Sequence, residues 1–219
     1  AYAVAARAND DALAWLGRLP SSWTLEGYGK RLLGIGDKVA RHIADEVKEG
    51  GPDARQFVCR APDYYGSVPD QGAVEAWMGS PADVRKVRAG PAWNALAAAG
   101  EKGNWMARLE LYYALSSANV SELSLLEQYR IVQLMEWLHK KKVGGLYSYF
   151  SATIPVAPGG NRSAAWRRQD QVFLYSAMLG DYDQQFRMGN VLLRETDPAL
   201  VEAGKAMRAC SQAAMPHRR

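Results

Sequence analysis

The chain has 219 residues, of which 48% are hydrophobic and 23% charged, and this composition is typical of a globular protein rather than a disordered one. No window approaches 18 consecutive apolar residues, so the sequence predicts no transmembrane segment. The net charge is +4, but the basic residues are spread along the chain. Their tightest cluster, 140–142, falls where a helix is expected to end, so no nucleic-acid partner is predicted.

The N-terminal region predicts short helices interrupted by glycine and proline. An apolar pattern favours a helix over 1–19, and Pro20 ends it. Four glycines between positions 23 and 36 predict an irregular segment, which lacks the spacing of a nucleotide-binding loop. Asp37 is then expected to cap a helix over 37–49, in which Val39 and Ile43 belong to an apolar stripe.

Three residues of this predicted helix, His42, Asp45 and Glu46, are of the types used in acid–base catalysis. The favoured interpretation is a solvated helix surface, because polar side chains on a surface helix usually face water. A loop over 61–71 follows that is rich in proline, tyrosine and glycine. Such a loop is typical of a boundary between segments.

Residues 93–115, WNALAAAGEKGNWMARLELYYAL, predict a helical hairpin. Its first helix is rich in alanine, whose short side chain permits close approach of a neighbouring backbone. Gly100 or Gly103 can end that helix, because glycine tolerates the positive φ of a helix C-cap. Asn104 is a favourable N-cap for the second helix.

The C-terminal half contains the clearest helical patterns. Apolar residues recur at helical spacing over 121–138, 163–179 and 183–193, and a last helix is expected to start at 196–198. A shorter helix rich in aromatic residues is predicted over 146–154. The sequence therefore predicts an all-α fold.

The hairpin pattern recurs, with predicted turns at positions 103, 141 and 180 that lie about 38 residues apart. The middle unit is weaker, because Lys141 stands where the other turns have glycine. One hairpin cannot bury its own apolar face, so successive hairpins are expected to share a core as a short solenoid. We therefore predict a helical-repeat domain over 73–219 and an N-terminal helical and loop segment over 1–72, with one continuous domain as the alternative.

The segments AAAGEKGNWMARLELYYAL and YSAMLGDYDQQFRMGNVLL resemble Sel-one-like repeats, which are relatives of tetratricopeptide repeats. Gly180, Gln185, Met188 and Gly189 follow the pattern of that family, whereas Tyr112 stands where glycine is usual. The resemblance covers roughly 91–193, and the first ninety residues lie outside it. The whole layout is similar to bacterial Sel-one-like proteins of a domain-of-unknown-function family, some of which look like lipoproteins or like immunity partners of secreted toxic effectors.

The resemblance implies a protein-binding module, in the first place an immunity protein that binds and neutralises a cognate effector of a type VI-like secretion system. The alternatives are an envelope scaffold or regulatory adaptor and, third, a hydrolase with a cryptic site. No cofactor and no metal are implied. No catalytic residue is assigned, because the sequence contains neither a nucleophile elbow nor a zinc-protease motif and its three histidines lie far apart.

Partner contacts are predicted among the aromatic and arginine side chains of the repeats, because these residue types dominate the energetics of protein interfaces. The alternative for each of them is a place in the helical core. The predicted contacts are Trp105, Tyr112, Tyr113, Tyr147, Tyr149, Tyr182 and Arg187. The loop that carries Tyr64 and Tyr65 is a further predicted contact.

The two cysteines, Cys59 and Cys210, lack the spacing of a zinc site. They are predicted to be either buried thiols or one long-range disulfide, and export would favour the disulfide. The resemblance to bacterial Sel-one-like proteins, together with Ala1 as the first residue, predicts that an export signal or lipid anchor has been removed. The expected location is therefore the periplasm or the cell envelope, with the cytoplasm as the alternative.

Overall fold

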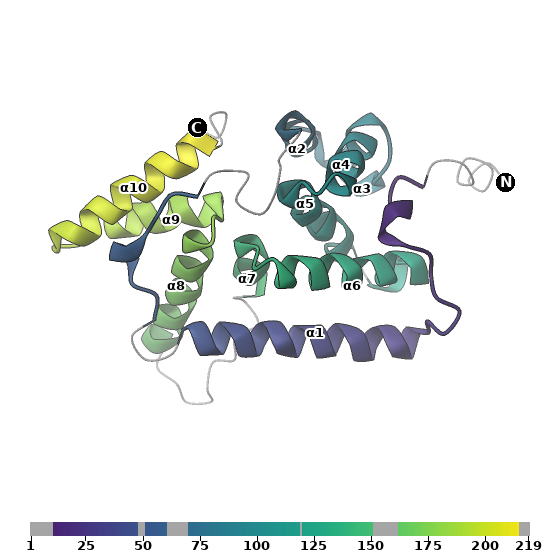
Figure 1. Ribbon diagram of the computed structural model, residues 1–219, viewed down its shortest axis with the longest axis horizontal. Coiled ribbons are helices and arrows are strands. Elements are labelled where there is room, and N and C mark those ends of the chain that lie inside the picture. The colour runs from purple at the N-terminus through teal and green to yellow at the C-terminus, as the bar shows by residue number, and fades with distance from the viewer. Residues whose placement is uncertain (1–10, 48–50, 61–69, 119, 151–161, 215–219) are drawn as a thin grey trace. The chain divides into compact units, whose positions relative to one another are not determined.

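Figure 1 shows a computed structural model, which describes residues 11–47, 51–60, 70–118, 120–150 and 162–214. Within these residues there are ten α-helices, α1 to α10, and no strand, so the predicted all-α fold is confirmed there. The chain forms two compact units: unit 1 comprises 1–35 and 66–140, and unit 2 comprises 36–65 and 141–219. The chain therefore leaves and re-enters unit 2, and the predicted boundary at residue 72 stays a prediction.

Unit 1 contains four main helices that pack in pairs: α2 (Gln71–Met78), α4 (Pro91–Glu101), α5 (Trp105–Ser116) and α6 (Leu125–Lys140). Its smaller elements are α3 (Ala82–Val87) and the short 3-10 helices η1 (Ala14–Leu16) and η3 (Val120–Glu122). The rings of Trp77 and Trp93, whose centroids lie 5.4 Å apart, join α2 to α4. Leu96 and Leu111 are fully buried between the helices, so the core of unit 1 is aromatic and aliphatic.

Besides residues 36–46 of α1 (Leu25–Glu46), unit 2 contains four complete helices: α7 (Gly144–Phe150), α8 (Arg162–Met178), α9 (Tyr182–Leu192) and α10 (Pro198–Ala214). The 3-10 helix η2 (Ala54–Gln56) packs against α10. α9 and α10 lie side by side (Figure 1), and two glycines permit this close approach. A Cβ atom on Gly189 would come within 2.9 Å of the Gly204 carbonyl oxygen.

The glycine-rich stretch predicted to be irregular is instead the first half of one long helix, α1 (Leu25–Glu46). Tyr28, Ile35, Val39 and Ile43 are all buried and recur at helical spacing. A glycine within a helix costs about 1 kcal/mol relative to alanine, whereas one buried large apolar side chain contributes roughly 1.5–3 kcal/mol. Burial of the apolar stripe therefore outweighs the glycines, and the predicted start at Asp37 is wrong.

The predicted helix over 1–19 is reduced to η1 in the part that the structure describes. Asp11 Oδ1 accepts a hydrogen bond from the Leu13 backbone N–H, and Gly17, with φ of 100°, ends the turn. A φ of this sign is favourable for glycine and unfavourable for other residues. Local turn geometry therefore replaces the expected helix.

The hairpin α4–α5 confirms the prediction made for residues 93–115. Gly103 has φ of 91°, and the Asn104 N–H donates to the carbonyl of Ala99 over 3.0 Å. The side chain of Asn104 accepts the N–H of Ala107 at 3.0 Å and caps α5 as expected.

The hairpin α8–α9 repeats the same turn. Gly180 has φ of 95°, and the Asp181 N–H donates to the carbonyl of Ser176 over 3.1 Å. Asp181 Oδ1 accepts the backbone N–H groups of Asp183 and Gln184 and caps α9. The two hairpins thus share a turn glycine, a cap residue and a backbone hydrogen bond.

A side-chain hydrogen bond also recurs between the two hairpins. Arg108 Nε donates to the Gly100 carbonyl at 2.7 Å, and Gln185 Nε2 donates to the Ala177 carbonyl at 3.0 Å. Both donors lie eight residues after their acceptors, and both acceptors lie near the C-terminal end of a first helix. Each hairpin therefore satisfies a carbonyl at this helix end in the same way.

The middle turn lies one residue later than predicted. Lys142, not Lys141, has the left-handed conformation, with φ of 53°. This turn lacks the glycine that marks the other two, so its sequence pattern is the weakest. A left-handed backbone at a residue other than glycine costs roughly 1–2 kcal/mol. The structure shows paired helices, and the continuous solenoid stays a prediction.

Candidate functional site

An open hollow on unit 1, here named the α3–α5 groove, has a volume of about 680 Å³. Volumes of this size are typical of ligand-binding clefts and hold several side chains. The residues that line it are Trp77, Ala82, Arg85, Lys86, Arg88, Glu110, Tyr113, Ala114, Ser117, Ala118 and Glu122. One of the predicted contacts, Tyr113, is among them.

The basic residues of the groove come from α3 and its C-terminal end. Arg85 and Lys86 lie in the last turn of this short helix, and both are exposed. Within the described residues, neither side chain takes part in an ion pair. The groove therefore presents two cations that no carboxylate of the described chain neutralises.

Arg88, which ends α3, is held differently. It has a left-handed backbone, with φ of 51°, and its Nη2 atom lies 3.4 Å from Oε1 of Glu127. The other oxygen of Glu127, Oε2, accepts the N–H and the hydroxyl of Ser124, both at 2.8 Å, in a capping box at the start of α6. Arg88 therefore attaches the end of α3 to α6, and its charge is already paired.

Acidic, short and aromatic side chains also line the groove. Glu110 and Glu122 supply the carboxylates. Ala114, Ser117 and Ala118, at and just after the end of α5, contribute short side chains. The groove is thus lined by residues of both charges and by small side chains.

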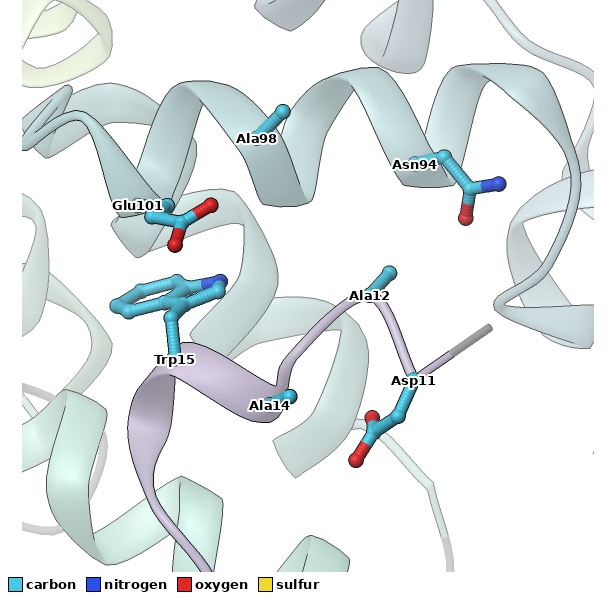
Figure 2. A pocket seen from close by; sticks show the side chains of 7 residues that line it. All are labelled: Asp11, Ala12, Ala14, Trp15, Asn94, Ala98 and Glu101. Carbon is cyan, nitrogen blue, oxygen red and sulfur yellow. The ribbon is translucent and has the colours of Figure 1, made fainter. Parts of the chain in front are cut away.

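Unit 1 has a second hollow of about 370 Å³ (Figure 2). Figure 2 shows Asn94, Ala98 and Glu101 on α4 facing the segment that carries Asp11 and Trp15. Two lining residues from this segment, Asp11 and Trp15, have partners elsewhere in unit 1. Asp11 forms an ion pair with Arg130, whose side chain is buried.

The indole of Trp15 takes part in a stacked cluster beside this hollow. The guanidinium of Arg108 lies 4.9 Å from the ring centroid of Trp15 and 4.2 Å from that of Trp137. Burial lowers the pKa of Arg108, and contact with two aromatic faces is favourable for its cation. These contacts fix the N-terminal segment, so we assign the second hollow a structural role.

Four of the seven predicted contact residues are buried in the helical core. The exposed fractions of Trp105, Tyr112, Tyr147 and Tyr182 are 4%, 3%, 0% and 3%. In this structure their rings pack inside the units, which was the alternative for each of them. Sequence spacing did not separate core from surface, because both hairpin helices have apolar residues on more than one face.

The other three predicted contacts reach the surface. Tyr113 is half-buried at the groove in unit 1, and in unit 2 Tyr149 is 45% exposed on α7. Arg187 is exposed on α9, with its guanidinium 4.0 Å from the ring centroid of Phe173. The predicted contact at Tyr64 and Tyr65 lies outside the described residues.

The charged residues of the groove were missed from the sequence. The basic residues over 85–88 were the available sign of a charged surface, but the prediction considered only the denser basic run over 140–142. Nothing in the local pattern indicates that Arg85, Lys86 and Arg88 line one hollow together with Glu110 and Glu122. That grouping follows from the fold of unit 1.

His42, expected on a solvated helix surface, is half-buried in unit 2. Its Nε2 atom lies 2.8 Å from the hydroxyl oxygen of Tyr175, and its ring centroid is 5.2 Å from that of Tyr147. Burial lowers the pKa of His42, while Glu46 at 4.0 Å acts in the opposite direction. Burial also raises the pKa of Tyr147. The surface interpretation is wrong for His42, because aromatic residues of α7 and α8 cover this side of α1. Asp45 and Glu46 are exposed, as that interpretation expects.

The lowered pKa of His42 predicts that unit 2 loses stability in mild acid. The unfolded chain binds a proton at the ordinary histidine pKa of about 6.5, whereas the folded state binds it only at lower pH. Stability is therefore fully present above pH ~6.5 and falls as the pH is lowered through that value. Thermal unfolding of the His42→Gln variant should show a weaker pH dependence than the wild type, whereas His139→Gln should not. An unchanged pH dependence in His42→Gln would contradict the role given to burial.

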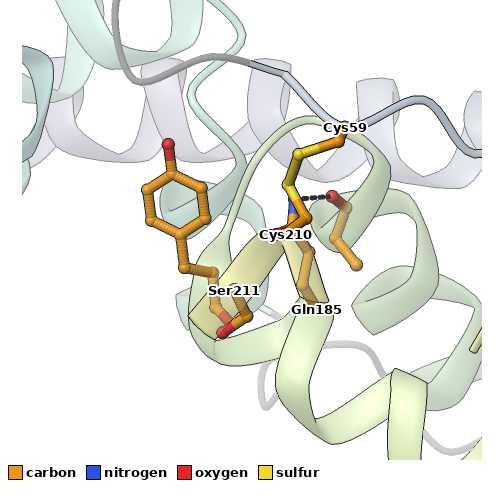
Figure 3. Close-up of a disulfide and its surroundings, with 6 residues drawn as sticks. Cys59, Gln185, Cys210 and Ser211 are labelled. Atoms are coloured by element: carbon orange, nitrogen blue, oxygen red, sulfur yellow. Dashed lines mark hydrogen bonds between the residues drawn. A yellow bond between two sulfur atoms is a disulfide. The ribbon is translucent and has the colours of Figure 1, made fainter. Parts of the chain in front are cut away.

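Cys59 and Cys210 are joined by a disulfide (Figure 3), so the structure contains the bonded form of the two predicted alternatives. The bond ties the segment 51–60 to α10. Arg55 Nη2, 2.6 Å from Asp197 Oδ2, attaches the same segment just before α10. A disulfide is consistent with an oxidising, extracytoplasmic compartment.

The comparisons with known proteins add no relative. The chain matches no family model, no curated protein and no solved structure. No helix in the described residues is long and apolar enough to cross a membrane, and no group of three metal-binding side chains is found among them. The Sel-one-like resemblance therefore depends on the two hairpins themselves.

Proposed function

We propose that this protein is a protein-binding helical-repeat module that holds a segment of its partner in the α3–α5 groove. The observation that carries the proposal is the groove itself, with about 680 Å³ of open volume, two unpaired cations, and aromatic and small residues in its lining. Arginine and tyrosine are enriched among the residues that dominate binding energy at protein interfaces. Arg85 and Tyr113 place both types in one accessible hollow.

The architecture supports this function. Helical-repeat proteins use the surface that their stacked hairpins expose for recognition. In unit 1, the cap at Asn104 and the hydrogen bond from Arg108 to Gly100 fix α5 relative to α4. The ion pair between Arg88 and Glu127 fixes the end of α3. The groove is therefore formed before a partner arrives, which lowers the entropic cost of binding.

The Sel-one-like resemblance favours one class of partner, a secreted toxic effector that this protein neutralises as an immunity protein. Inhibition would be steric, because a bound repeat surface can cover an active site or hold an enzyme closed. The disulfide supports a periplasmic or envelope location for that encounter. An envelope scaffold of the same fold is the alternative, and it predicts a resident complex rather than a toxin.

The test is co-purification from the native host, with the neighbouring genes expressed. We expect a stoichiometric partner that elutes with the wild type and is lost from the variant with Arg85→Glu and Lys86→Glu. The matched control, Arg18→Glu with Lys102→Glu, makes the same change in net charge at exposed positions outside the groove and should keep the partner. A partner that kills cells when expressed alone supports the immunity function. Absence of any partner, or equal loss from both variants, would overturn the proposal.

A further inference from the structure

We propose that residues 11–19 form a detachable strap, which occupies in cis a site on unit 1 for a linear peptide. The strap runs beside α4, as Figure 2 shows for Asp11 and Trp15. A Cβ atom on Gly100 of α4 would come within 3.2 Å of the Trp15 ring. None of the contacts described below involves a residue that lines the α3–α5 groove, so the inference does not rest on the proposed function.

Side chains at positions 11, 13 and 15 attach the strap to the helices. Asp11 forms an ion pair with Arg130 on α6. Leu13 is only 3% exposed. The ring of Trp15 receives the guanidinium of Arg108 on α5, which lies 4.9 Å from the ring centroid. The occupant that is already present therefore defines what the site accepts: a carboxylate, a leucine and a tryptophan at alternate positions of a short peptide.

The backbone of the strap forms hydrogen bonds only within the strap. The N–H groups of Ala14, Leu16 and Gly17 each donate to the carbonyl three residues earlier. Within the described residues, no backbone group of the strap is hydrogen-bonded to α4, α5 or α6. Release of the strap therefore loses side-chain contacts but breaks no backbone hydrogen bond with the rest of unit 1, as is typical of segments that open locally.

The docked strap leaves two buried donor atoms without a hydrogen-bond partner in the described chain. They are Nε1 of Trp15 and Nε of Arg130. Arg130 as a whole is only 6% exposed. A buried donor without an acceptor is unfavourable, because it has lost water and gained nothing in exchange. A peptide that brings acceptors to these two atoms can therefore compete with the strap.

The chain that follows the strap is firmly attached. Trp23 is buried, and its ring centroid lies 4.9 Å from that of Tyr129 on α6. Residues 20–22, between the strap and this anchor, are all exposed. A strap released at 20–22 thus stays tethered at an effective concentration in the millimolar range, so it excludes weakly binding peptides.

The probe is the acetylated, amidated peptide Asp-Ala-Leu-Ala-Trp-Leu-Gly-Arg-Leu, which has the sequence of the strap and is added to the full chain. Its binding is followed by the indole N–H NMR signal of Trp137, whose ring centroid lies 4.2 Å from the guanidinium of Arg108. The Trp15→Ala variant lacks the main anchor of the strap. We expect it to bind the peptide at least roughly tenfold more tightly than the wild type, in which the tethered strap competes. Bound peptide should return the Trp137 signal toward its wild-type position.

Arg18→Ala is the matched control, because Arg18 belongs to the strap but is exposed and forms no ion pair within the described residues. This variant should exclude the peptide as the wild type does. A peptide with alanine in place of tryptophan should not bind the Trp15→Ala variant. Asp11→Asn, which removes the ion pair with Arg130 at nearly unchanged side-chain size, should admit the strap peptide with an affinity between those of the wild type and Trp15→Ala.

Three results would overturn the proposal. The first is equal binding of the peptide to the wild type and to Trp15→Ala, which would show that the strap does not occupy the site. The second is a folded Trp15→Ala or Asp11→Asn variant that binds no peptide. The third is loss of the dispersed amide signals of α4, α5 and α6 in Trp15→Ala, because a detachable strap requires that unit 1 stays folded without this anchor.

Discussion

Loss of the disulfide is expected to lower the free energy of unfolding of unit 2 by about 3–5 kcal/mol. The bond closes a loop with a sequence separation of 151 residues, and long loops lose the most entropy when they are closed in the unfolded chain. Unit 2 is made of two chain pieces, 36–65 and 141–219, which the segment 66–140 of unit 1 separates. Cys59 lies on the first piece and Cys210 on the second, so the bond joins them directly.

Hydrogen exchange of α10 is the suitable measurement for this prediction. Cys59→Ser and Cys210→Ala remove the bond without adding a hydroxyl at the buried position. The two single variants and the double variant should all exchange faster in α10, and by the same amount, because each abolishes the same bond. Helices of unit 1 serve as the internal reference. Slow exchange in α10 of the reduced wild type, equal to that of the oxidised protein, would contradict the prediction.

Gly144→Ala is expected to destabilise unit 2 by about 3 kcal/mol. A Cβ atom at this position would lie 2.4 Å from the carbonyl oxygen of Ser176, a backbone atom that cannot rotate away. The same two residues are also joined by a hydrogen bond, in which the Ser176 hydroxyl donates to the Gly144 carbonyl at 2.6 Å. α7 and α8 would therefore have to separate to admit one methyl group.

The matched control is Gly34→Ala on α1, where an added Cβ atom meets nothing within 4 Å. Alanine is the better helix former by about 1 kcal/mol, so this variant should be unchanged or more stable. Thermal unfolding of the two variants separates the contact at Gly144 from the general effect of replacing glycine in a helix. Equal unfolding temperatures would show that the approach of α7 to α8 does not need glycine.

The hairpins were predictable because their signals are local. Gly103 and Gly180 supply positive φ, and Asn104 and Asp181 cap the following helices, all within a few residues of each turn. Such signals depend little on the rest of the fold. The middle turn was misplaced by one residue because Lys142 adopts the same left-handed conformation although it is not a glycine.

The errors arose where distant residues decide the outcome. Four glycines concealed the start of α1, although the stripe from Tyr28 to Ile43 continues through them and is buried. His42 was predicted to lie at the surface because its partner Tyr175 is 133 residues away in the sequence. Burial of this kind is a property of packing between helices.

The candidate site was the least predictable part. Aromatic residues were chosen as contacts, yet four of them fill the core, where aromatic side chains bury the most area. The groove instead depends on the pairing of Arg88 with Glu127, which attaches the end of α3 to α6 and leaves Arg85 and Lys86 exposed. No sequence spacing connects these residues.

Hydrogen exchange of the partner complex, compared with the free protein, tests the α3–α5 groove as the binding surface most directly. Bound partner should slow exchange over 82–88 and 110–118, which contain most of the residues that line the groove. Exchange around Tyr149 and Arg187 in unit 2 should stay unchanged. Protection confined to unit 2, with 82–88 and 110–118 exchanging as in the free protein, would show that the partner binds elsewhere.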